Sequence, residues 1–128
     1  MTAKEYLQQY RESLTRTNEI TAHLADLRTI AESLKNEQGD HVGLDDAVAN
    51  LVDAQTQTAA ELDNLCRLRN EIRDVIDRVP SDRHRELLTE RYINGWTLVR
   101  IAADRSQSYE HVCRLHGAAL CAVSGLLP

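Results

Sequence analysis

Side chains able to contact a ligand are concentrated near the C-terminal end of this 128-residue chain, where the spacing predicts a helix after Ser108. Three apolar residues step along one side of this helix: Val112, Leu115 and Ala119. Four residues project from the opposite side: Glu110, Cys113, Arg114 and Gly117. A hairpin that only packs on its neighbours does not need such an accessible polar face. The pattern therefore favours a helix that can enter the major groove of DNA.

Other kinds of chemistry fit the sequence less well. The same predicted helix carries four residues of metal-binding type: His111, Cys113, His116 and Cys121. Only Cys113 and His116 share a face at ligand spacing, and two ligands do not complete a tetrahedral zinc site. Asp40, Asp45 and Asp46 lack the spacing of a calcium loop. No nucleophile with its base, phosphate-binding loop or pair of catalytic carboxylates is visible. The sequence predicts neither an enzyme nor a protein that holds a metal or cofactor.

Two short helices joined by a tight turn must position the polar face. Thr97 and Ser108 stand at the two predicted helix starts, where a side-chain hydroxyl can accept a backbone N–H. If Leu98 opens the first helix, Ile101 and Ala102 fall on its inner side, and the small Ala102 lets the two helices cross closely. The pattern predicts a helix-turn-helix unit.

A further helix precedes this unit. Ser81 can cap a helix over residues 81–93, and the Asn94-Gly95 dipeptide that follows is a C-terminal stop signal. Trp96 is expected to fill the junction between helices rather than bind a ligand. Residues 80–128 are therefore predicted to form one C-terminal domain.

The segment RELLTERYINGWTLVRIAADRSQSYEHVCRLHGAAL resembles region 4 of sigma-70 factors. Within that superfamily it looks most like small phage-encoded proteins of the autolysin-regulator (ArpU-like) group. The runs RYINGWT, HVCRLHGAAL and the opening TAKEYLQQYR all fit that group. The domain resemblance covers residues 81–124, and the resemblance to the group implies an activator of late phage genes.

The resemblance implies that the second helix of the unit reads DNA bases, as in sigma region 4. The residues at its contact positions are Tyr109, Glu110, Cys113 and Arg114. A carboxylate such as Glu110 accepts a hydrogen bond from cytosine N4, and a guanidinium such as Arg114 donates to guanine. Tyr109 is expected to contact a base or the backbone, and Arg100 and Arg105 to hold phosphates.

The chain also departs from sigma region 4. Tyr109 and Cys113 stand where arginines are usual, and Arg105, Ser106 and Gln107 stand where leucine, glycine and an apolar residue are common. Serine at the glycine position costs free energy if its φ is positive. An alternative stays open: a protein-interaction module that docks on RNA polymerase or another partner without sequence-specific DNA binding.

Residues 1–79 are predicted to form a long, coiled-coil-like antiparallel helical hairpin. The expected stripe of its first helix is Leu7, Tyr10, Leu14, Thr17, Ile20, Leu24, Leu27, Ala31 and Leu34. The expected stripe of its second helix is Leu44, Val48, Leu51, Gln55, Thr58, Leu62, Leu65, Arg69, Ile72, Ile76 and Val79. The polar segment NEQGDHVG between them reads as a loop. Further apolar residues widen the second helix and favour a homodimer over a self-sufficient two-helix stalk: Val52, Ala59, Cys66 and Val75.

Charge is distributed unevenly. The whole chain has a net charge of −5. Residues 1–80 hold 9 Lys/Arg and 15 Asp/Glu, a net −6, whereas residues 81–128 hold 6 and 5, a net +1. The acidic hairpin is not attracted to DNA, and the C-terminal part is less basic than most free-standing DNA binders. Binding is therefore expected to need dimerisation or attachment to RNA polymerase.

The overall prediction is an all-α, cytoplasmic transcriptional regulator, phage or prophage encoded. No apolar run approaches the length of a membrane span, and three cysteines without paired spacing are expected to be reduced thiols. Its expected partners are double-stranded DNA and a second copy of the chain, with RNA polymerase as a further candidate. A purely structural coiled-coil protein is a third alternative.

Overall fold

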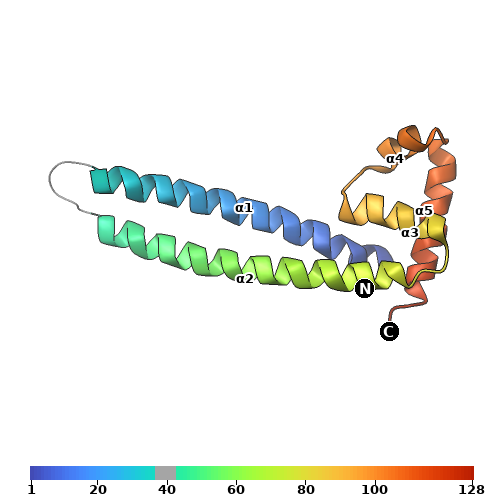
Figure 1. The fold of residues 1–128 in the computed structure, drawn as a ribbon, viewed down its shortest axis with the longest axis horizontal. Helices are drawn as coiled ribbons and strands as arrows, with labels where there is room; N and C mark the ends of the chain where they lie inside the picture. The colour runs from blue at the N-terminus through green and yellow to red at the C-terminus, as the bar shows by residue number, and fades with distance from the viewer. Residues whose placement is uncertain (37–42) are drawn as a thin grey trace. The chain divides into compact units, whose positions relative to one another are not determined.

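The computed structural model describes residues 1–36 and 43–128. Two long helices, α1 (Ala3–Asn36) and α2 (Leu44–Asp77), pack antiparallel as a hairpin (Figure 1). Four shorter helical segments follow: α3 (Asp82–Leu88), the π-helical turn η1 (Thr89–Ile93), α4 (Leu98–Arg105) and α5 (Tyr109–Ser124). The predicted all-α class, with a helical hairpin before a small helical unit, is confirmed. Most of the predicted loop NEQGDHVG, with Asp40, lies outside the described residues.

The chain divides into two compact units. Unit 1 contains residues 1–12 and 66–128, and unit 2 contains residues 13–65. Unit 1 thus joins the start of α1 and the end of α2 to the C-terminal helices. The guanidinium Nη1 of Arg11 donates to the carbonyl oxygen of Ile93 within this unit, at 3.2 Å. A boundary near residue 79 stays a prediction.

Residues at the start of each long helix stabilise its first turn. Thr2 and Glu5 form a capping box, because the Glu5 N–H donates to the Thr2 hydroxyl and the Thr2 N–H donates to the Glu5 carboxylate, at 3.1 and 3.3 Å. Asp45 and Asp46 lie in the first turn of α2, where negative charge is favourable.

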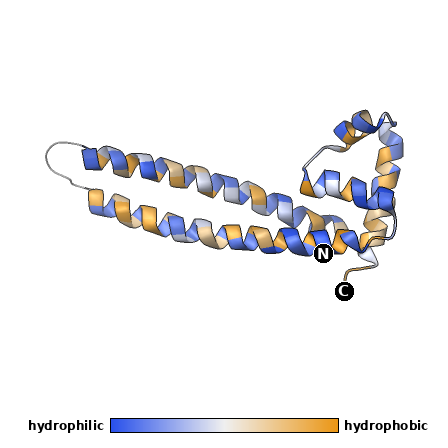
Figure 2. Ribbon diagram, in the orientation of Figure 1, coloured by the Kyte–Doolittle hydropathy of each residue, from blue (hydrophilic) through white to orange (hydrophobic). Residues whose placement is uncertain are grey.

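The stripe predicted for α1 is buried or half-buried along its length, but the stripe predicted for α2 is wrong in part. Four of its members are exposed: Val48, Gln55, Leu62 and Arg69. The column one residue earlier is covered instead: Ala47, Ala54, Leu68 and Val75 are buried, and Glu61 is half-buried. The two columns lie on opposite sides of the column that contains Leu51 and Thr58, and both fit the same three- and four-residue spacing. The spacing alone therefore did not distinguish them. Figure 2 shows apolar and polar residues alternating along both long helices.

The middle of the hairpin contains a polar layer. Ser13, Thr17 and Thr58 are buried. Thr17 donates its hydroxyl to the Ser13 carbonyl at 2.8 Å, and Thr58 donates to the Ala54 carbonyl at 2.7 Å. Within the described ranges, the buried Ser13 Oγ and Glu61 Oε2 have no hydrogen-bond partner. This layer contributes less to stability than the apolar layers, since a buried polar atom without a partner is unfavourable.

Candidate nucleic-acid interface

Each of the three C-terminal α-helices begins at a hydroxyl cap that the sequence predicted. Ser81, Thr97 and Ser108 are the N-caps of α3, α4 and α5. The Thr97 hydroxyl accepts the Arg100 N–H, and the Ser108 hydroxyl accepts the His111 N–H, each at 3.1 Å from the third residue of its helix. Such caps typically stabilise a helix by about 1 kcal/mol, so they fix where α4 and α5 start.

The turn between α4 and α5 places a serine in a glycine conformation. Ser106 has φ 53° and ψ 41°, in the left-handed region. The Ser106 N–H donates to the Ala103 carbonyl at 3.3 Å, and the Gln107 N–H donates to the Ala102 carbonyl at 3.0 Å. These two bonds complete a Schellman motif, the usual way to end a helix with a left-handed residue. The φ of Ser106 is positive, so the free-energy cost expected for serine at this position applies.

A small apolar core holds α5 against α3 and α4. Leu87, Ile101, Ala102 and Val112 are all buried in one cluster. Three partly buried side chains pack on this cluster: Trp96, Leu98 and Leu115. The predicted inner faces of the two helices and the predicted junction role of Trp96 are confirmed. Because one face of α5 is fixed by this core, its opposite face is held in a defined orientation.

The opposite face of α5 is open. Glu110, Arg114 and Gly117 are exposed, Tyr109 is 52% exposed, and Cys113 is half-buried. A hydrogen bond with the Cys113 thiol raises the pKa of Tyr109 above its ordinary value. The face thus presents a carboxylate, a guanidinium and a phenol within the first two turns of the helix. These groups can donate to and accept from base edges or phosphates.

The two arginines predicted to hold phosphates lie in different surroundings. Arg100 is exposed, and its guanidinium lies over the Trp96 ring, 4.0 Å from the ring centroid. The Arg105 side chain is only 16% exposed and forms ion pairs with Glu90 at 3.2 Å and Glu86 at 3.9 Å. Arg100 can therefore meet a phosphate while it stays stacked, whereas Arg105 ties the end of α4 to α3 and η1.

A pocket of about 240 Å³ lies in unit 1 beside the start of α5. Seven residues line it: Lys4, Arg91, Thr97, Leu98, Val99, Tyr109 and His116. No role was predicted for Lys4 or Arg91, because the sequence does not show that the start of α1 and the turn η1 lie beside α5. Only the packing of α1 with the C-terminal helices brings Lys4 to the same pocket as Tyr109.

His116 lines this pocket and is held in place by Tyr92. Its Nε2 shares a hydrogen bond of 2.8 Å with the Tyr92 hydroxyl, and the two rings stack with centroids 5.8 Å apart. Burial lowers the pKa of His116, and the positive charges of Arg91 and Lys4 lower it further. Within residues 1–36 and 43–128, no three His, Cys, Asp or Glu side chains are grouped as a metal site would need.

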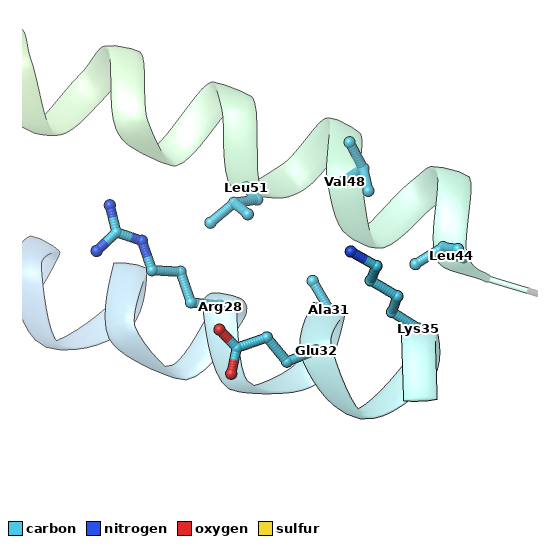
Figure 3. A pocket seen from close by; sticks show the side chains of 7 residues that line it. All are labelled: Arg28, Ala31, Glu32, Lys35, Leu44, Val48 and Leu51. Atoms are coloured by element: carbon cyan, nitrogen blue, oxygen red, sulfur yellow. The ribbon is translucent and has the colours of Figure 1, made fainter. Parts of the chain in front are cut away.

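Unit 2 has a hollow of its own at the end of the hairpin near residue 44. This pocket of about 420 Å³ has an apolar side on α2 and a charged side on α1. Figure 3 shows Arg28 and Lys35 extending from α1 toward α2, where Val48 and Leu51 lie. The hollow adds to the exposed apolar surface of α2.

Comparison with known proteins found no matching family model, no matching curated protein and no matching solved structure. None of the helices in the described part of the chain is both long and apolar enough to cross a lipid bilayer.

Proposed function

We propose that this chain is a DNA-binding transcriptional regulator, phage or prophage encoded, that inserts α5 into the major groove. The observation that carries the proposal is the exposure of Glu110 and Arg114 on a helix whose other face is fixed by a buried core. In this mechanism Arg114 donates to a guanine, and Glu110 accepts from a cytosine. Tyr109 and the half-buried Cys113 contact the same site, and Arg100 contacts a phosphate. The resemblance of the sequence to sigma region 4 implies the same role for this helix.

The charge of the two units supports a division of tasks. Unit 1 holds 12 Lys/Arg and 10 Asp/Glu, a net +2, whereas unit 2 holds 3 and 10, a net −7. DNA therefore attracts unit 1 weakly and repels unit 2. A homodimer compensates for weak binding, because two linked contacts raise the overall affinity without new interactions. The exposed Val48, Val52 and Leu62 of α2 are apolar surface that a second copy can cover.

The experiment selects a binding site from a random duplex pool and then compares three proteins on it. Arg114→Ala is expected to lose about 1–3 kcal/mol of discrimination at one base pair. Arg16→Ala, which removes an exposed arginine from α1 in unit 2, is the matched control and should bind as the parent does. If the pool yields no preferred site, or both variants discriminate as the parent does, α5 does not read DNA in this way.

A second function is favoured by two apolar side chains next to the polar face. Val99 is 66% exposed and Tyr109 is 52% exposed, and exposed apolar groups of this kind serve in protein contacts. The same surface can dock on RNA polymerase without reading DNA. Val99→Ser weakens polymerase capture in that case and leaves the salt-dependent binding to duplex DNA unchanged.

A further inference from the structure

We propose that the pocket lined by Lys4, Arg91 and His116 binds a phosphate-type oxyanion. Two of these side chains are cationic, and none of the seven lining residues is acidic. Thr97 and Tyr109 add hydroxyl groups that can donate hydrogen bonds to an oxyanion. Cationic and hydroxyl donors around one hollow are the groups that recognise phosphate.

The carboxylates that neighbour Arg91 and Lys4 in the sequence have partners of their own. Glu90, which precedes Arg91, pairs with Arg105 at 3.2 Å. Glu5, which follows Lys4, accepts the Thr2 N–H in the capping box. The positive charges at the pocket are therefore not neutralised by these two neighbours. Burial is the main cause of the lowered pKa of His116, and the positive charges of Arg91 and Lys4 lower it further.

The pocket has room for a small anion and its water. Its volume of about 240 Å³ compares with the roughly 30 Å³ that one water occupies in the liquid. Two sources of phosphate fit this chemistry, namely a free anion and the backbone of DNA bound along α5. The pocket reaches Tyr109, the first residue of α5, so a phosphate here lies next to the proposed DNA face.

The test follows the imidazole resonances of His116 by NMR in the full chain. Inorganic phosphate is titrated against sodium chloride at matched ionic strength. Phosphate, but not chloride, is expected to shift the resonances and to raise the pKa of His116, because the anion offsets the two positive charges. A separate titration uses a short duplex of random sequence. A shift with the duplex identifies backbone phosphate as the source, and a shift with inorganic phosphate alone identifies a free anion.

Matched lysine variants on α1 make the test specific. Lys4→Gln removes an exposed side chain at the pocket and is expected to weaken binding about tenfold, the effect of losing one charged hydrogen bond. Lys35→Gln removes an exposed lysine in unit 2 and should leave binding unchanged. The proposal is overturned if neither probe moves the His116 resonances, or if the two variants respond alike. The free-phosphate titration contains no DNA, so its result does not depend on whether α5 reads bases.

Discussion

The register of the hairpin can be tested with two leucines that lie six residues apart on α2. Leu68 is 8% exposed and Leu62 is 45% exposed, although the sequence favoured Leu62 for the buried stripe. Truncating a buried leucine to alanine costs about 2–5 kcal/mol, from lost apolar burial and the cavity left behind. Leu62 keeps only about half of its surface covered, so Leu62→Ala should cost about 1 kcal/mol or less. Alanine is also slightly the better helix former.

Thermal unfolding followed by circular dichroism distinguishes the two cases. For a chain of this length, 1 kcal/mol lowers the melting temperature by roughly 3–5 °C, so Leu68→Ala should lower it by roughly 6–25 °C. The scans are repeated over a range of protein concentrations, because a loss at Leu62 that grows with concentration reports a dimer contact. If Leu62→Ala is as damaging as Leu68→Ala at every concentration, the burial assigned to α2 is wrong by one residue.

Three further predictions concern unit 1. Gly95 has φ +78° and a Cβ there would overlap a neighbouring guanidinium, whereas Gly117 lies in an exposed helix with open space around it. Gly95→Ala should therefore lower the free energy of unfolding by about 1–2 kcal/mol, and Gly117→Ala should raise it by about 0.5–1 kcal/mol, both measured by urea unfolding. Ser106→Gly should raise it by about 1 kcal/mol because the left-handed conformation is unfavourable for serine, and an unchanged urea midpoint would contradict that cost. Burial and nearby cations lower the pKa of His116, so as pH falls below 6.5 the unfolded chain gains a proton that the folded chain does not. The free energy of unfolding should decrease until the pH reaches the folded-state pKa. His116→Gln should reduce this decrease, His23→Gln on the exposed side of α1 should not, and identical melting profiles from pH 7.5 to 5.5 would contradict it.

Local signals made most of the C-terminal helices predictable. A hydroxyl such as Ser108 before an apolar period marks a helix start by itself, and Gly95 marks a helix end, because both effects act within one turn. The π-helical turn at Thr89–Ile93 was not predicted, since its 3.0 Å bond from the Asn94 N–H to the Thr89 carbonyl depends on how the segment packs.

Features that depend on contacts between distant segments could not be read from the sequence. Ala47 and Ala54 are weak apolar signals, yet they are buried in α2 where the larger Val48 is exposed. The pairing of Arg105 with Glu90 and Glu86 likewise needs α4 to fold back on α3 and η1. In both cases the sequence gives the type of the side chain, but it does not show which distant residues that side chain contacts.

The salt dependence of DNA binding connects the proposals about α5, the pocket and the homodimer. If Lys4, Arg91 and Arg100 each neutralise one phosphate, the slope of log K against log salt should be about −2.7 for one chain and about −5.4 for a homodimer. Lys4→Gln should then reduce the slope by about 0.9 per chain, whereas Arg114→Ala should change base preference more than slope. Fluorescence anisotropy on the selected duplex between 50 and 200 mM salt measures both quantities. A slope near zero would mean that phosphate contacts do not hold this surface on DNA, and protein docking would then be the better account of its exposed Val99 and Tyr109.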